Sequence, residues 1–134
     1  MFEATRNQLT NIGNPFQGDA KRQGDAKRVL CVCAAGLLRS PTLANVLHKE
    51  LGYNTRACGT ASSFALVPIT EALIYWSEEI IFVDTDCKDY LTPEVIEDIV
   101  NSEAEITNLN VPDTFNYGDD ELEQILLQQY LMSD

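Results

Sequence analysis

The chain has 134 residues, of which 45% are hydrophobic, and its 21 acidic and 9 basic residues give a formal net charge of −12. This length suits one domain whose core needs no disulfides. An acidic chain disfavours a broad nucleic-acid surface, because such binding depends on clustered Lys and Arg. No stretch approaches the ~20 apolar residues that span a bilayer. We therefore expect neither a nucleic-acid partner nor a membrane partner.

The first residues lack the basic start and apolar centre of a signal peptide, so we expect a cytoplasmic protein. Its four cysteines should then be reduced. Cys31 and Cys33 are two residues apart on a predicted strand, which is poor geometry for a disulfide.

Residues 1–28 are polar and contain a perfect tandem repeat, because Gln17–Arg22 recurs as Gln23–Arg28. Two copies are too short for a solenoid. We interpret 1–28 as an N-terminal extension and 29–134 as the folded domain. A basic docking arm is a weaker alternative, because an Asp partly balances each Lys-Arg pair.

From residue 29 onward, apolar runs and helical patterns alternate. We predict strands at 29–33, 55–58, 79–84 and 105–110, and helices at 41–51, 70–77, 93–101 and 120–132. Thr92-Pro93 and Asp119 are expected helix starts. The last helix should present Leu122, Ile125, Leu126, Gln129 and Tyr130 on one face. Alternating βα units imply an α/β fold, with a parallel sheet between two helical layers and ligands at the carboxyl ends of the strands.

The most informative segment follows the first strand and reads Cys33-Ala-Ala-Gly-Leu-Leu-Arg39-Ser40-Pro41. Ser40 suits the N-cap of the next helix, and Pro41 suits its first position. A loop between a strand and a helix directs backbone N–H groups and the helix dipole at one point, which favours both phosphate and a thiolate. Arg39 adds a planar pair of donors for phosphate oxygens. The sequence therefore predicts a phosphatase-like site.

Cleavage of a phosphate ester also requires a proton donor. His48, the only histidine, is expected on the solvated face of the first helix. One histidine and unpaired cysteine spacings give no metal site, so we expect no metal or other cofactor. Asp84 and Asp86 follow the third strand and are secondary candidates. Asp113 is favoured, because it follows the fourth strand in a loop with two aromatic residues, Phe115 and Tyr117.

The Cys33-x5-Arg39-Ser40-Pro41 segment with a late aspartate loop resembles the low-molecular-weight protein tyrosine phosphatase family, and most closely its short bacterial and phage members. Three further segments, 57–60, 80–91 and 111–124, resemble the family, so the likeness covers about residues 29–132. The resemblance implies a three-layer αβα sandwich with a four-stranded parallel sheet in the order 2-1-3-4.

The resemblance also implies roles for single residues. Cys33 would be the nucleophile, Arg39 the phosphate clamp and Asp113 the general acid and base. Ser40 would stabilise the thiolate, and the backbone of Ala34, Ala35, Gly36, Leu37, Leu38 and Arg39 would bind phosphate. The substrate would be a phosphotyrosine-containing protein or a small aryl phosphate, cleaved through a phosphocysteine.

The chain departs from the family at Gly36, Leu38 and Thr114. Leu38 replaces a second cysteine, so the family's protective disulfide cannot form. Arsenate reduction on the same fold is one alternative, with Cys87 as a conceivable redox relay. A sugar-transport phosphocysteine carrier is disfavoured, because its loop lacks the arginine. A non-catalytic phosphate or phosphopeptide binder is the alternative from another class.

Overall fold

The computed structural model describes residues 26–34, 39–61, 67–111 and 120–133. Its strands are β1 (Arg28–Cys33), β2 (Asn54–Gly59), β3 (Glu79–Phe82) and β4 (Glu105–Asn108). Its helices are α2 (Arg39–Leu51), α3 (Glu71–Trp76), α4 (Pro93–Ser102) and α5 (Asp120–Met132), with the 3-10 helix η2 (Asp86–Tyr90) before α4. Every predicted strand and helix is present, with ends shifted by at most two residues. None of the described helices is long and apolar enough to cross a membrane.

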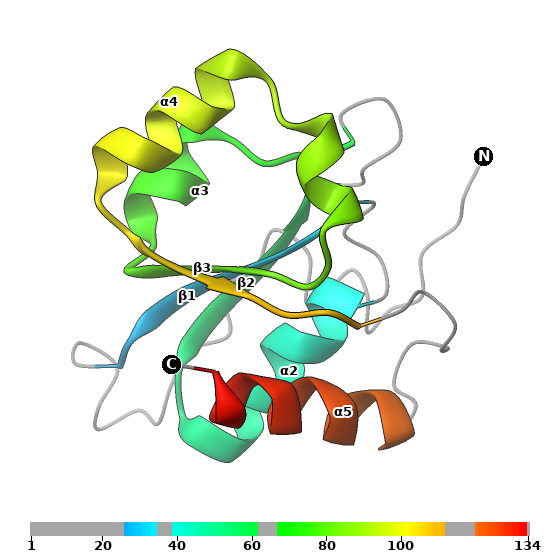
Figure 1. The fold of residues 1–134 in the computed structure, drawn as a ribbon. Helices are drawn as coiled ribbons and strands as arrows, with labels where there is room; N and C mark the ends of the chain where they lie inside the picture. The colour runs from blue at the N-terminus through cyan, green and yellow to red at the C-terminus, as the bar shows by residue number, and fades with distance from the viewer. Residues whose placement is uncertain (1–25, 35–38, 62–66, 112–119, 134) are drawn as a thin grey trace.

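The four strands form one parallel sheet in the order β2-β1-β3-β4. Figure 1 shows α2 and α5 on one face of this sheet and α3 and α4 on the other. The predicted three-layer α/β sandwich and its strand order are therefore confirmed.

Because the strands are parallel, their carboxyl ends meet at one edge of the sheet. Cys33 at the end of β1 aligns with Gly59 of β2. Val32 aligns with Phe82 of β3, which in turn aligns with Asn108 of β4. The segments that leave these strands start side by side, and one of them begins at Cys33.

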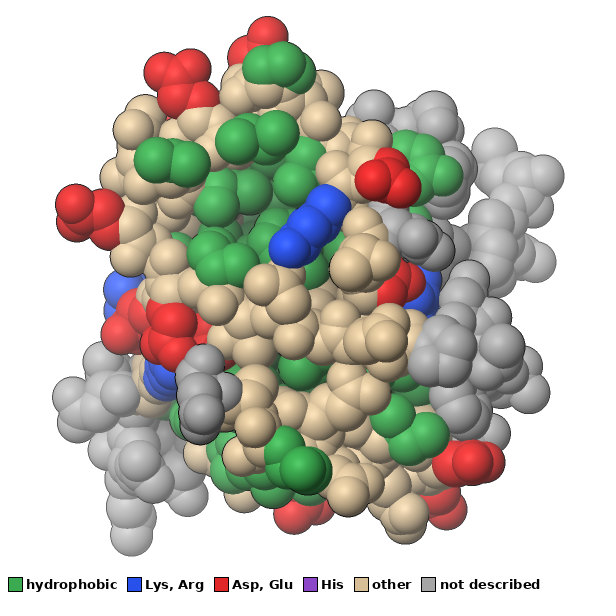
Figure 2. Space-filling model, in the orientation of Figure 1, with side chains coloured by type: hydrophobic (Ala, Val, Ile, Leu, Met, Phe, Trp, Pro, Cys, Tyr) green, Lys and Arg blue, Asp and Glu red, His purple; other side chains and the backbone are tan. Residues whose placement is uncertain are grey.

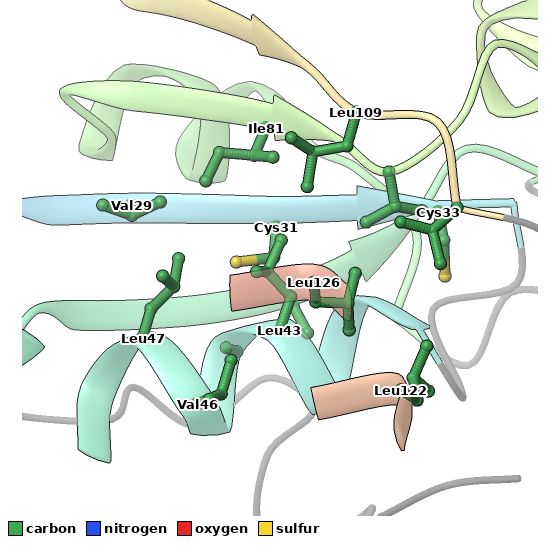
Figure 3. Close-up of a cluster of buried hydrophobic side chains, with 14 residues drawn as sticks. Val29, Cys31, Cys33, Leu43, Val46, Leu47, Ile81, Leu109, Leu122 and Leu126 are labelled. Carbon is green, nitrogen blue, oxygen red and sulfur yellow. The ribbon is translucent and has the colours of Figure 1, made fainter. Parts of the chain in front are cut away.

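The central strand β1 is buried on both faces, so its side chains divide between two hydrophobic clusters. Val29, Cys31 and Cys33 face α2 and α5, as Figure 3 shows. Leu30 and Val32 belong to the cluster beneath α3 and α4. The predicted inner face of the last helix is confirmed, because Leu122 and Leu126 are fully buried and Ile125 and Tyr130 pack against them. Each such fully buried leucine contributes about 1.5–3 kcal/mol.

One of the predicted helix starts is confirmed and one is wrong. The Thr92 hydroxyl accepts a hydrogen bond from the Val95 N–H at 3.3 Å, with Pro93 as the first residue of α4. Helix α2 already begins at Arg39, so Ser40 lies inside its first turn and is not the N-cap. Its hydroxyl contacts Cys33 and Cys58 instead. Asp119 lies outside the described residues.

The amino end of the sheet carries a buried polar network that includes the second copy of the repeat. Ala26 is buried, and the Lys27 Nζ lies 2.8 Å from Glu79 Oε1. The Tyr130 hydroxyl donates to the same oxygen at 2.8 Å, and the Thr107 hydroxyl donates to Glu79 Oε2. These contacts satisfy the buried carboxylate, which would otherwise destabilise the fold. The end of the second repeat copy is therefore packed against the sheet.

Candidate functional site

Backbone hydrogen bonds fix the point at which the Cys33 segment leaves the sheet. The Thr60 N–H donates to the Cys33 carbonyl oxygen at 3.0 Å, and the Ala61 N–H donates to the Ala34 carbonyl oxygen at 2.9 Å. On the other side of β1, the Val83 N–H donates to the Val32 carbonyl oxygen at 3.0 Å. Cys33 is thus held from both neighbouring strands.

The Cys33 thiol contacts a hydroxyl in the first turn of α2. Its Sγ donates to the Ser40 Oγ at 3.1 Å, and the Ser40 hydroxyl donates to the Cys58 carbonyl oxygen at 3.3 Å. Ser40 is fully buried, so these contacts set its orientation. A hydroxyl can rotate, and it can donate to the sulfur once the thiol has lost its proton. The amino-terminal turn of α2 also favours negative charge beside it.

Arg39 is buried at the same edge, and its guanidinium is held by the segments that follow β3 and β4. The Nη1 atom donates to the Val111 carbonyl oxygen at 3.0 Å. The same nitrogen forms an ion pair with Asp84 Oδ2. Because both partners are buried, loss of either one would leave an uncompensated charge. The two contacts therefore fix the orientation of the guanidinium.

Asp84 has a role that the sequence analysis missed. Its Oδ2 pairs with Arg39, and its Oδ1 accepts a hydrogen bond from the Cys87 N–H at 3.0 Å. The sequence suggested Asp84 as a secondary candidate for the proton donor. Both of its carboxylate oxygens are engaged, and its contact with Arg39 makes it a positioning residue for that side chain. Its location after a buried strand was visible in the sequence, but its pairing with Arg39 depends on the folded arrangement.

Several predicted site residues lie outside the described residues. These are Ala35, Gly36, Leu37 and Leu38 of the loop, and Asp113 with its neighbours Thr114, Phe115 and Tyr117. The described residue nearest to Asp113 in the chain is Val111. Its N–H donates to the Val83 carbonyl oxygen at 3.0 Å, and its carbonyl accepts from Arg39. The chain therefore passes Arg39 two residues before Asp113.

The other cysteines are buried and free. Cys58 and Cys87 belong to the cluster beneath α3 and α4, whereas Cys33 belongs to the cluster on the opposite face. Burial raises the pKa of the Cys87 thiol to about 12, and the nearby Cys33 adds to the shift. Burial likewise raises the pKa of Cys58. Both thiols are therefore poor nucleophiles at neutral pH.

His48 is half-buried near the far end of α2, where its Nδ1 lies 3.0 Å from the Tyr53 carbonyl oxygen. The predicted solvated position is thus only partly correct, because the side chain is half-buried and contacts the backbone. Across the described part of the chain, no group of three or more His, Cys, Asp or Glu side chains is arranged to hold a metal ion.

Comparison with solved structures identifies a chain with the same fold. Wzb from Vibrio vulnificus, a low-molecular-weight tyrosine phosphatase solved in complex with benzylphosphonate, aligns with a TM-score of 0.59 and 15% identity. The alignment covers 79% of this chain and 95% of Wzb. No protein-family model matches the sequence, and a search of curated proteins found no similar sequence. The resemblance to this phosphatase family is therefore confirmed at the level of the fold.

Proposed function

We propose that this protein is a phosphomonoester hydrolase of the protein tyrosine phosphatase type. The observation that carries the proposal is the meeting of three side chains at one sheet edge. The Cys33 thiol lies 3.1 Å from the Ser40 hydroxyl, and the adjacent Arg39 guanidinium is held by Asp84. A nucleophile, a hydroxyl that can donate to it and an oriented cation are the groups that phosphoryl transfer to sulfur requires.

The proposed reaction has two steps. In the first, the Cys33 thiolate attacks phosphorus in line, the bond to the ester oxygen breaks, and Asp113 gives its proton to the leaving phenol. In the second, Asp113 takes a proton from water, which attacks the phosphocysteine and releases phosphate and the thiolate. The position of Val111 beside Arg39, two residues before Asp113, supports this assignment of the acid.

Phosphate binding in this proposal uses mainly the backbone of the loop from Ala34 to Arg39, with Ser40 contacting the thiolate. The N–H groups of such a loop and the first turn of α2 supply partial positive charge over a short range. Arg39 would bind two phosphate oxygens through its guanidinium N–H groups. No metal or other cofactor takes part.

The proposed substrate is a phosphotyrosine-containing protein or a small aryl phosphate in the cytoplasm. An aromatic leaving group is consistent with the benzylphosphonate in the Wzb complex and with Phe115 and Tyr117 near Asp113 in sequence.

A phosphate or phosphopeptide binder without activity is the second candidate, because the loop alone would suffice for it. Arsenate reduction is disfavoured, because burial raises the pKa of Cys87 to about 12 and so keeps this thiol protonated at neutral pH.

The direct test is hydrolysis of an aryl phosphate by the purified protein. Rapid mixing should give a burst of phenol of about one equivalent per chain, because the phosphocysteine accumulates before it is hydrolysed. Cys33→Ser should abolish the burst and the turnover, whereas Cys31→Ser on the same strand should retain both. Turnover by Cys33→Ser would exclude the proposed nucleophile. Phosphate binding without turnover in the wild-type protein would establish the binder instead.

A further inference from the structure

The two edge strands of the sheet differ in how well they are covered. In β2 five of six residues are buried, whereas in β4 three of four are exposed. Figure 1 shows β4 at the border of the sheet beneath α4. An open edge strand presents unpaired backbone groups that can pair with another chain. Of the two edges, β4 is therefore the one available for such pairing.

An apolar surface continues from this open edge onto α4. Ile106 of β4 aligns with Ile80, whose side chain belongs to the cluster beneath α3 and α4, so Ile106 lies on that face of the sheet. It is nevertheless 40% exposed. On α4, Ile96 is 48% exposed and Val100, one turn later, is 69% exposed.

These three side chains lie on the same side of the α4 layer. Val95 and Ile99 face the sheet. In a right-handed β3–α4–β4 unit, the residues that follow them, Ile96 and Val100, lie on the flank toward β4. Figure 2 shows hydrophobic side chains gathered over α4 and between α4 and β4. We call Ile96, Val100 and Ile106 the α4–β4 shelf.

The backbone of β4 is oriented to extend the sheet. The Glu105 N–H donates to the Glu78 backbone carbonyl oxygen at 3.0 Å, and the Leu109 N–H donates to the Phe82 carbonyl oxygen at 2.8 Å. Both hydrogen bonds lie on the β3 side of the strand. Because alternate residues of a strand direct their backbone groups to opposite sides, those of Ile106 and Asn108 point to the open edge. A further strand could pair with them.

The charge around the shelf defines the partner. The exposed acidic residues of α4, β4 and the turn between them are Glu94, Glu97, Glu103 and Glu105. No Lys or Arg follows Lys88 in the sequence, and the Lys88 Nζ lies 5.1 Å from the centre of the Phe82 ring in the cluster beneath α3 and α4. Glu105 aligns with Glu79, whose carboxylate binds Tyr130 of α5, so Glu105 projects on the face opposite the shelf. Its side chain remains 58% exposed, although Lys27 Nζ lies 3.7 Å away. A basic partner would complement these carboxylates, whereas a second copy of this acidic chain would place like charges against one another.

We propose that the open edge of β4 and the α4–β4 shelf bind an extended segment of a partner protein in which basic and apolar residues alternate. The segment adds to the sheet as a fifth strand. Its apolar side chains lie on Ile96, Val100 and Ile106, and its basic side chains lie on the opposite face near Glu105. Alternation places these two sets on opposite faces of the added strand.

The test uses a heptapeptide that alternates lysine and valine, with amide hydrogen exchange followed by NMR on the full chain. At a peptide concentration tenfold above its Kd, exchange of the Ile106 and Asn108 amides should slow by about tenfold relative to the free protein. A peptide of the same sequence with alternate N-methylated backbone amides should give no protection, because it cannot pair along the edge.

Two variants and a matched control examine the shelf. Ile106→Lys and Val100→Lys should each weaken peptide binding by at least about tenfold, because each removes apolar contact area and adds a like charge. Leu131→Lys makes the same change in charge at a 60% exposed position on α5 and should change the Kd by less than about twofold.

Three outcomes would overturn the proposal. The first is unchanged exchange of the β4 amides when the peptide binds. The second is equal weakening by Leu131→Lys and Ile106→Lys, which would show adsorption to the acidic surface as a whole. The third is sedimentation of the free protein as a dimer whose β4 amides are already protected, which would assign this edge to a second copy of the chain.

Discussion

Replacement of Asp84 by asparagine separates the positioning of Arg39 from proton donation. The carboxylate serves Arg39 through Oδ2 and the Cys87 N–H through Oδ1. An asparagine side chain has the same shape but only one acceptor oxygen. If that oxygen keeps the hydrogen bond from the Cys87 N–H, the amide NH2 of the asparagine faces the Arg39 guanidinium. Both of these groups are donors, so no hydrogen bond can form between them. Asp84→Asn must therefore lose one of the two contacts, and it also leaves the buried Arg39 charge without its anion.

The expected losses follow from these contacts. A hydrogen bond to a charged group is worth about 1.5–3 kcal/mol, so the free energy of unfolding should fall by about that amount in urea denaturation. A catalytic group displaced by about 1 Å costs on the order of 10²-fold, so kcat/KM for aryl phosphates should fall by about 10- to 100-fold. Asp89→Asn removes the same charge from an exposed position in η2 and should change neither quantity.

Dependence on the leaving group distinguishes Asp84 from Asp113. Arg39 would contact the phosphoryl group, so Asp84→Asn should slow phenyl phosphate and a highly fluorinated aryl phosphate by the same factor. Asp113→Asn should slow phenyl phosphate by about 10²–10⁴-fold and the fluorinated substrate much less, because its leaving group needs no proton. A strong leaving-group dependence in Asp84→Asn would refute the positioning role. Full activity in a folded Asp84→Asn protein would refute it as well.

Three further expectations concern the cysteines and Arg39. Iodoacetate at about pH 6 should modify Cys33 and not Cys87, with protection by inorganic phosphate; equal modification of the two would contradict the proposed nucleophile. Arg39→Lys should lower kcat/KM by about 30- to 150-fold, or 2–3 kcal/mol, because lysine cannot donate two parallel N–H groups; unchanged kinetics would remove Arg39 from the site. Burial raises the pKa of Cys87 from 9.0 to about 12. Between these two values the thiol loses its proton in the unfolded chain and keeps it in the folded protein. In urea denaturation Cys87 should then contribute a fall in stability of about 1.4 kcal/mol per pH unit, and Cys87→Ala should reduce the total slope by that amount.

The periodicity of the sequence predicted the fold because local patterns and packing agree along most of the chain. The consecutive apolar side chains of β1 can all be buried only if β1 is a central strand with helices on both faces of the sheet. The apolar spacing of the last helix matches its buried face, and Figure 3 shows Leu122 and Leu126 of that face in the cluster with Cys31 and Cys33. The strand ends were overestimated after β3 and β4, where Val83 and Leu109 continue the apolar pattern although the chain already turns toward Arg39.

The details of the site depend on contacts between residues far apart in sequence, which local patterns do not encode. Ser40 has the composition of an N-cap, but the thiol of Cys33 and the carbonyl of Cys58 bind its hydroxyl. Glu79 begins an apolar strand and is buried, because Lys27, Tyr130 and Thr107 converge on it from three other segments. Asp84 acquires its role in the same way, through Arg39. In each case the residue type suggested a polar contact, but the sequence did not show which residue would be the partner.

The Arg39–Asp84 pair also bears on how so acidic a chain can bind a phosphate. A guanidinium matched by a buried carboxylate adds little net positive charge, and the net charge of −12 opposes the approach of any anion. The attraction in the proposed site must therefore come from groups within a few ångströms, namely the loop N–H groups and the first turn of α2. Asp84 then contributes geometry, because it holds the planar donors of Arg39 in one orientation at the sheet edge where Cys33 emerges. Such a site would favour a small phosphate-bearing group that can reach the end of the loop over an extended polyanion, whose remaining charges would meet the acidic surface.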